Sequence, residues 1–202
     1  DIPLKFTADI HEVTYTRVAG NGFEENDEVG VFALVGSSTM KEERYADNLR
    51  FFRTSEKVFE SSEPIYYPDD EVTLRLISYY PYQEEGVNMG ESTMSVAVET
   101  DQNLSAGYFC SDFLVASQNL QSAPKGAIAL HYDHKFFKLK IALVGKEGEE
   151  LQGILDADPK LSVCGFYTKA IYDFQKETYS AFSNEKSITP AGKWEIQGDR
   201  LS

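Results

Sequence analysis

The sequence predicts an all-β protein, and three observations carry that prediction. Apolar and polar residues alternate with a period of two in several stretches, as in a strand with one buried face. Turn-forming stretches such as Ala19-Gly20-Asn21-Gly22 separate them at the intervals expected for an antiparallel sandwich or barrel. Helical spacing of apolar residues is scarce, whereas Phe and Tyr, which favour strands, number 13 and 12.

The strand candidates differ in how clearly they alternate. The clearest are residues 2–10, 72–80, 94–98 and 137–143. Shorter candidates lie at 29–34, 113–116, 127–132, 161–166, 170–174 and 194–196. The least patterned stretch is 37–64, whose aromatic residues follow no clean period. We therefore expect an irregular crossover there, in preference to a short helix around Lys41–Asn48.

Charge is divided unevenly along the chain. The 202 residues carry 19 Lys+Arg and 33 Asp+Glu, a net charge of -14, of which residues 1–100 hold -12 and residues 101–202 only -2. At about 150 residues per domain, this length allows one or two domains. With a turn-rich boundary at Ala123-Pro124-Lys125-Gly126, we expect an N-terminal sandwich at 1–125 and a partial one at 126–202. The acidity excludes nucleic acid as a partner, because it repels phosphate backbones.

Composition leaves the cellular location open. No run approaches the roughly 18 apolar residues of a membrane helix, and the chain starts at Asp1 without a basic and apolar leader. The protein is therefore either cytoplasmic or exported with its targeting segment removed. Cys110 and Cys164 lie among apolar or aromatic residues, so we expect two buried thiols, with a single disulfide as the alternative.

No catalytic or metal-binding constellation stands out, so we expect no enzyme, no cofactor and no metal site. His131 and His134 form the only close histidine pair, but such spacing puts the two rings on opposite faces of a strand, and His11 is remote in sequence. The acidic run at 24–28 lacks EF-hand spacing. There is no G-x-S-x-G elbow and no phosphate-binding glycine loop. A carboxylate pair for glycoside hydrolysis stays open, because its test is spatial.

Tyrosines give the chain its most distinctive local composition. They occur in Ile65-Tyr66-Tyr67-Pro68 and Tyr79-Tyr80-Pro81-Tyr82. Aromatic side chains with a polar tip suit a core as well as a contact with a glycan or a protein. We favour core packing and keep the alternative that Tyr66, Tyr67, Tyr79, Tyr80 and Tyr82 form a stacking platform for a glycan or a partner.

A series of motifs in a fixed order resembles the fimbrillin-like (Mfa-like) proteins of gut and oral anaerobic bacteria. It runs through Thr16-Arg17, Phe23-x-x-x-Asp27-x-Val29-Gly30-Val31-Phe32-Ala33, Tyr45-x-x-Asn48, Ile65-Tyr66-Tyr67-Pro68, Ser78-Tyr79-Tyr80-Pro81-Tyr82, Asp101-Gln102, Ser111-Asp112-Phe113-Leu114-x-Ala116 and Leu130-x-x-x-His134-x-x-x-Lys138-Leu139. The series covers residues 4–143. Val163-x-Gly165-x-x-x-x-Ala170-x-Tyr172-Asp173-Phe174 is similar to the start of the family's second domain.

The resemblance implies a structural or accessory subunit of a cell-surface fimbria, or pilus, that acts in adhesion. It implies two transthyretin-like, Greek-key β-sandwich modules. It also implies a secreted lipoprotein at the outer membrane, exported through a cleaved signal and held by a lipid anchor that this chain does not contain. Its partners would be other fimbrial subunits, joined by β-strand exchange, and host proteins or glycans. A glycan-binding surface lipoprotein with the tyrosine platform is the alternative.

Two further expectations follow from the resemblance. Arg17 matches the family's Thr-Arg position, and in related subunits cleavage after an arginine frees the groove that accepts a strand. Second domains of the family usually continue beyond the point reached here. The chain is therefore expected to be either truncated or built with an incomplete second module, which would expose a groove and favour oligomers.

Overall fold

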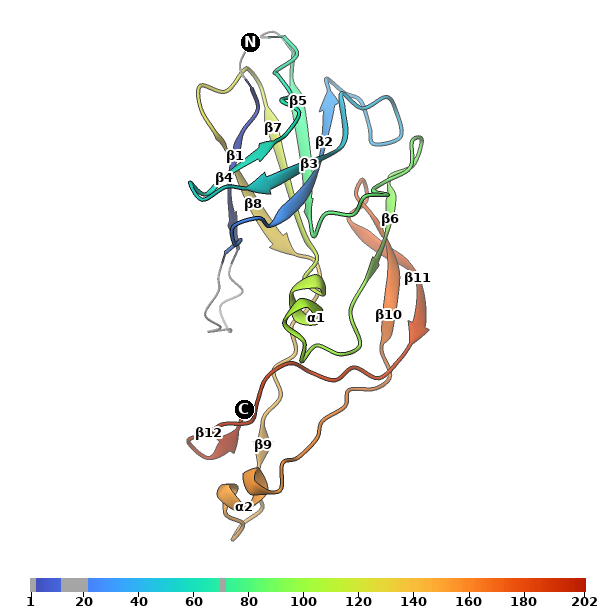
Figure 1. Cartoon of the computed structure of the whole chain (residues 1–202). Helices are drawn as coiled ribbons and strands as arrows, with labels where there is room; N and C mark the ends of the chain where they lie inside the picture. The colour runs from blue at the N-terminus through green and yellow to red at the C-terminus, as the bar shows by residue number, and fades with distance from the viewer. Residues whose placement is uncertain (1–2, 12–21, 70–71) are drawn as a thin grey trace. The chain divides into compact units, whose positions relative to one another are not determined.

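The protein is all-β, as predicted. The structure is a computed structural model, and it describes residues 3–11, 22–69 and 72–202 (Figure 1). The strands are β1 (Phe6–Ile10), β2 (Glu28–Val35), β3 (Ala46–Arg53), β4 (Val58–Ser61), β5 (Leu74–Tyr80), β6 (Thr93–Ala97), β7 (Leu114–Leu120), β8 (Ile128–His134), β9 (Leu143–Val144), β10 (Tyr167–Asp173), β11 (Thr178–Glu185), β12 (Ile196–Gln197) and β13 (Arg200–Leu201). Two short helices accompany them, α1 (Ser105–Cys110) and α2 (Leu151–Asp156).

Seven strands form a closed barrel in the order β1-β4-β3-β2-β5-β7-β8. All neighbours are antiparallel except β1 and β8, which close the barrel in parallel with Phe6 opposite Ile128. Each strand of this barrel therefore has a paired neighbour on both sides. The inward residues form one apolar cluster in which the Phe6 and Phe51 rings lie 4.3 Å apart. The strand face that alternation predicts to be buried is therefore the inside of this barrel.

Strand β2 is buried on both faces. Val29, Val31 and Ala33 belong to the barrel core, whereas the intervening Phe32 packs against Tyr79 and Phe174 on the other side. A Cβ at Gly30 would lie 2.2 Å from a ring carbon of Tyr79, so only glycine lets that ring pack across β2.

A bulge interrupts the pairing of β2 with β3. Between the pairs Val31–Leu49 and Ala33–Ala46, β2 advances two residues and β3 three. Asn48 lies in the bulged part of β3, which has one extra residue, and it has a positive φ of 49°. The expected crossover at 37–64 is corrected here, because this stretch holds β3 and β4. The bulge shifts the phase of alternation within β3 and so hides the strand from a period-two search.

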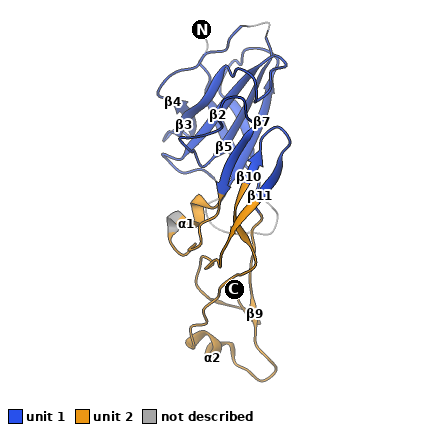
Figure 2. Ribbon diagram, turned by 90° about the vertical axis from the view of Figure 1, so that its right-hand side faces the viewer, with its two compact units in different colours: residues 1–96, 112–136, 171–181 blue, residues 97–111, 137–170, 182–202 orange. Residues whose placement is uncertain are grey.

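The chain divides into two compact units (Figure 2). Unit 1, blue in the figure, comprises residues 1–96, 112–136 and 171–181, and unit 2, orange, comprises 97–111, 137–170 and 182–202. The division falls within β6, β10 and β11, which pair in the order β11-β10-β6. The expected domain boundary between residues 125 and 126 stays a prediction; β8, which follows it, belongs to the barrel of unit 1.

Unit 2 has little regular structure of its own. Its sheet β12-β13-β9 consists of strands of two residues each, and α2 has no buried residue. Trp194 Nε1 donates to the carbonyl of Pro159 at 2.7 Å, which joins two of its loops. Among the described residues, no helix is long and apolar enough to cross a membrane.

Three expectations are corrected in unit 2. The strand expected at 137–143 is present only as β9, because no strand of the described chain pairs with residues 137–142. The strand expected at 161–166 is reduced to a single bridge between Val163 and Ile188. Both cysteines are free and exposed, not buried, because their apolar neighbours in sequence do not enclose them.

Candidate functional site

Residues 137–142 of unit 2 form an extended amphipathic segment that no described strand covers. Apolar Phe137, Leu139 and Ile141 alternate with Lys138 and Lys140. The Phe137 and Leu139 side chains are 74% and 55% exposed. The pattern is that of a strand with one face meant for burial. Here Phe137 and Leu139 on that face are exposed, Ile141 is partly buried, and the Phe137 ring lies 6.0 Å from Phe166.

A hollow lies beside the same segment. It has a volume of about 380 Å³ and is lined by Lys140, Ala142, Gln197, Arg200 and Ser202. Exposed apolar side chains recur elsewhere in unit 2, at Leu104, Val144, Tyr167, Phe182 and Ile196. Single exposed apolar residues are ordinary on a protein surface, but here they accompany a segment that pairs with no described strand.

A second hollow lies on unit 1 and contains two exposed tyrosines. Its volume is about 350 Å³, and Tyr45 and Tyr66, 43% and 40% exposed, lie in its wall with Asp47 and Glu63. The Tyr45 hydroxyl donates to the carbonyl of Tyr66 at 3.0 Å. Tyr45 is not among the platform tyrosines expected from the sequence, because it lies outside the two tyrosine clusters, although it begins the Tyr45-x-x-Asn48 motif.

Comparison with known proteins identifies the family. The profile of the fimbrillin-like family matches residues 16–200. The chain belongs to the fimbrillin-like family. The resemblance carried by the order of motifs is therefore confirmed.

Two solved structures from Bacteroides species are similar in fold to this chain. A candidate cell adhesion protein of Bacteroides ovatus has 16% sequence identity and a TM-score of 0.64, covering 100% of this chain and 76% of its own. A candidate cell adhesion protein of Bacteroides uniformis has 18% identity and a TM-score of 0.61, covering 98% of this chain and 72% of its own. These likenesses show a shared fold. The comparison with curated proteins found no match.

The five predicted tyrosines of this fimbrillin-like chain lie in different environments. Tyr79 is fully buried. Tyr67 and Tyr80 are partly buried against the barrel core, where their hydroxyls donate to the carbonyl of Val72 at 2.5 Å and to the carboxylate of Asp27 at 3.3 Å. Tyr82 is half-buried with the Arg50 guanidinium 6.0 Å from its ring. Tyr66 is the one exposed member of the five.

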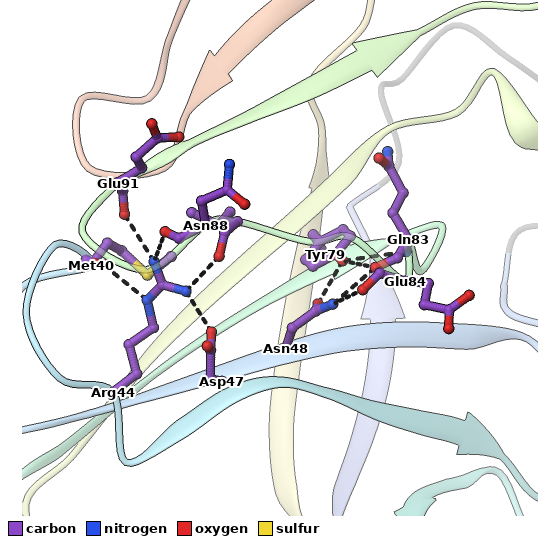
Figure 3. Close-up of polar contacts among 10 residues, drawn as sticks. Met40, Arg44, Asp47, Asn48, Tyr79, Gln83, Glu84, Asn88 and Glu91 are labelled. Atoms are coloured by element: carbon purple, nitrogen blue, oxygen red, sulfur yellow. Dashed lines mark hydrogen bonds and ion pairs between the residues drawn. The ribbon is translucent and has the colours of Figure 1, made fainter.

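The Tyr79 hydroxyl is held by the polypeptide itself (Figure 3). It donates to Asn48 Oδ1 at 2.7 Å, and the backbone N–H of Gln83 donates to it at 3.3 Å. The Asn48 amide in turn donates to the carbonyls of Gln83 and Glu84 at 2.9 and 3.2 Å. Burial raises the pKa of Tyr79 to about 12. This tyrosine therefore anchors the loop after β5 and has no free hydroxyl for a ligand.

Arg44 anchors the other end of that loop. Its side chain is buried, and its guanidinium lies 5.2 Å from the Phe32 ring centre. Figure 3 shows Arg44 between the segment that holds Met40 and Asp47 and the segment that holds Asn88 and Glu91. Its N–H groups donate to the carbonyls of Met40, Val87, Asn88 and Glu91 at 2.8–2.9 Å and to the carboxylate of Asp47. All five guanidinium donors have acceptors within the chain, so Arg44 has a structural role that sequence reasoning missed.

The structure describes the three histidines but not the predicted maturation site. Arg17 lies outside the described residues. His134 is hydrogen-bonded to Asp112 at 2.7 Å. His131 lies instead beside His11, which follows β1, with 5.6 Å between ring centres. The histidine considered remote in sequence is thus the one that the barrel brings next to His131.

Proposed function

We propose that this chain is a structural or accessory subunit of a cell-surface fimbria, that it acts in adhesion, and that it assembles by β-strand exchange. Membership of the fimbrillin-like family over residues 16–200 supports the fimbrial role. The observation that carries the assembly mechanism is the amphipathic segment at 137–142 of unit 2, with which no described strand pairs. The occupant is an extended strand from a second fimbrial subunit.

The backbone of this segment favours such a partner. An extended chain presents alternating N–H and C=O groups that stay unpaired until a neighbouring strand satisfies them. Residues 137–142 make no strand pairing with any described residue. Addition of a strand is a common way to satisfy such groups across an interface, because the main chain gives affinity and the alternating side chains give specificity.

The side chains favour the same partner. Burial of Phe137 and Leu139 by an incoming strand contributes about 25 cal/mol for each Å² of apolar surface removed from water. Charge also favours contact at unit 2, which holds 8 Lys+Arg and 10 Asp+Glu, against 11 and 23 in unit 1. Two copies therefore approach with the least repulsion through unit 2, where Lys138 and Lys140 attract an acidic strand.

The finer features of the family remain part of this proposal. The subunit is a lipoprotein of the outer membrane, exported through a cleaved signal and held by a lipid anchor, and its two modules are transthyretin-like sandwiches. Cleavage after Arg17 matures it. Digestion of the folded protein with an arginine-specific protease, followed by N-terminal sequencing, is expected to yield a new terminus at Val18. Absence of that terminus contradicts the maturation step.

Strand exchange is tested by placing a photo-cross-linking amino acid at position 139 in fimbriated cells. We expect irradiation to yield a ladder of covalent oligomers, with the cross-link in an extended segment of the neighbouring subunit. Met89 in unit 1 is the matched control position, because it is also apolar and is 61% exposed against 55% for Leu139. No ladder from position 139, or an equal ladder from position 89, contradicts the proposal.

The hollow with Tyr45 and Tyr66 favours a second candidate, a glycan-binding surface. Two exposed rings supply stacking faces, and Asp47 and Glu63 supply acceptors for sugar hydroxyls. A glycan array compares the wild type with Tyr45→Ala and Tyr66→Ala. Loss of binding without loss of folding supports the glycan function, whereas an array without a bound glycan contradicts it.

A further inference from the structure

Four side chains with metal-binding groups meet on the outer face of the parallel pair β1 and β8. Asp9 lies opposite His131 in the register of the two strands. The backbone N–H of His11 donates to the carbonyl of Tyr132 at 2.9 Å and so extends the pairing by one step. Since side chains alternate along a strand and Tyr132 is buried, His131 and Asp133 both point outward.

The four groups form two His–Asp pairs, and in each pair the histidine and the aspartate come from opposite strands. His131 Nδ1 lies 2.5 Å from Asp9 Oδ1, and His11 Nδ1 lies 2.7 Å from Asp133 Oδ1. The two imidazoles stack with 5.6 Å between centres and 7° between planes. The sequence Asp9-x-His11 on one strand and His131-x-Asp133 on the other produces this arrangement, because the pairing places each histidine opposite an aspartate.

We propose that Asp9, His11 and His131 bind a Zn²⁺ ion. One ligand atom from each of the three lies within 4.8 Å of the other two. Zn²⁺ bonds imidazole nitrogen and carboxylate oxygen at about 2.0–2.2 Å, so ligand atoms on a tetrahedral ion are about 3.3 Å apart. Side chains here must close by no more than about 1.5 Å. Asp9 and His131 exchange their mutual hydrogen bond for bonds to the ion, and their exposure of 64% and 51% leaves room for this movement.

Asp133 completes the arrangement as an outer partner. A histidine whose Nδ1–H is held by a carboxylate presents its Nε2 lone pair in a fixed direction, and such partners commonly accompany metal-bound histidines. His11 is held in this way by Asp133. Water fills the remaining position on the ion, since the face is open to solvent. The net charge of -12 on unit 1 further attracts a cation to it.

The ion joins the two strands that close the barrel. It binds only when β1 and β8 are paired, because the ligands come from positions 9, 11 and 131. A ligand that binds the folded state alone stabilises it in proportion to the logarithm of its concentration above Kd. Zn²⁺ is therefore expected to raise the Tm of the chain. Imidazole and carboxylate ligands also suit Ni²⁺ and Cu²⁺.

The test uses isothermal titration of ZnCl₂ into the chain without a polyhistidine tag. The wild type is expected to bind one ion, and His11→Gln and His131→Gln are each expected to weaken binding at least about tenfold. His134→Gln is the matched control, because His134 is the only other histidine and pairs with Asp112 outside the cluster. It is expected to bind as the wild type does.

A second measurement needs no variant, so it stands even where a substitution disturbs folding. Zn²⁺ is expected to protect His11 and His131 of the wild-type chain from diethylpyrocarbonate while leaving the reaction of His134 unchanged. No saturable binding by the wild type overturns the proposal. Equal weakening in the His134→Gln variant, or equal protection of all three histidines, overturns it as well.

Discussion

The two units of this chain bury apolar side chains to very different extents. In unit 1 the barrel closes on itself, and phenylalanines such as Phe6, Phe32 and Phe51 are fully buried. In unit 2 the strands β9, β12 and β13 have two residues each, and Phe137 and Phe182 are 74% and 58% exposed. The same kind of residue thus completes a core in unit 1 and is exposed to solvent in unit 2.

Charge follows the same division. Unit 1 carries a net charge of -12 and unit 2 of -2. A strongly charged surface keeps copies apart, whereas a nearly neutral one with exposed apolar side chains favours association. The comparison therefore assigns stability to unit 1 and assembly to unit 2 within the proposed function.

The largest expected effect comes from truncating one phenylalanine in each unit. Phe51→Ala empties part of the barrel core and is expected to lower the free energy of unfolding by about 4 kcal/mol. Phe137→Ala is expected to change it by less than about 0.5 kcal/mol, because the ring is already exposed. Denaturant unfolding followed by near-UV circular dichroism measures both. Comparable losses in the two variants contradict the division between the units.

Replacing one arginine in each unit is expected to change the free energy of unfolding by different amounts. Arg44→Ala removes a buried guanidinium and leaves four carbonyls without their donor, which is expected to cost about 3 kcal/mol. Arg200→Ala in unit 2 removes a 54% exposed side chain paired with Asp199, and we expect a loss below about 0.5 kcal/mol. The same denaturant titration applies. A loss below about 1 kcal/mol for Arg44→Ala contradicts its anchoring role.

Alkaline pH is expected to destabilise unit 1. Burial raises the pKa of Tyr79 to about 12 and also raises the pKa of Tyr132, whereas tyrosine in the unfolded chain titrates near 10. The unfolded state therefore loses these protons first, and stability falls as pH rises above 10. Each tyrosine is expected to remove about 1 kcal/mol by pH 11.

The tyrosine titration is followed by absorbance at alkaline pH together with circular dichroism. Tyr132 has its hydroxyl 2.6 Å from Ser78 Oγ in the barrel interior. Its ionisation should therefore coincide with unfolding. Ionisation of all twelve tyrosines near pH 10 in a folded chain contradicts the burial of these two rings.

The smallest expected effect is a gain in stability from Tyr172→Phe. Within the described chain the Tyr172 hydroxyl is buried and has no hydrogen-bond partner, while its ring packs edge-on against Phe113 and Phe174. Removing that oxygen while keeping the ring is expected to stabilise unit 1 by about 1 kcal/mol. A higher denaturation midpoint with an unchanged slope checks this. Destabilisation would mean that the hydroxyl is satisfied.

Sequence periodicity predicts strands whose alternation is intact. The alternating stretch 72–80 contains β5, and the continuous apolar run at 29–34 lies within β2. It misses β3, where one extra residue changes the phase, and β11, where Ala181 and Asn184 have positive φ and most side chains are exposed. A local pattern does not show which strands pair, so the parallel closure of β8 on β1 was not expected.

The candidate sites show the same limit. Alternation at 137–142 predicts a strand that the structure does not have there, because a pattern does not say whether a partner strand lies in the same chain. The Asp9–His131 and His11–Asp133 pairs each join residues 122 apart in sequence, so only the folded barrel reveals them. Arg44 is found only once the loop that it anchors is placed.

Hydrogen exchange of the isolated chain and of the chain within assembled fimbriae tests whether residues 137–142 pair with a strand of a second subunit. Amides of the barrel strands, such as those of β2 and β5, are expected to be protected in both states. Amides of residues 137–142 are expected to exchange freely in the isolated chain and to become protected on assembly, because an incoming strand pairs with them. Residues 137–142 that exchange equally fast in both states would contradict strand exchange at this segment.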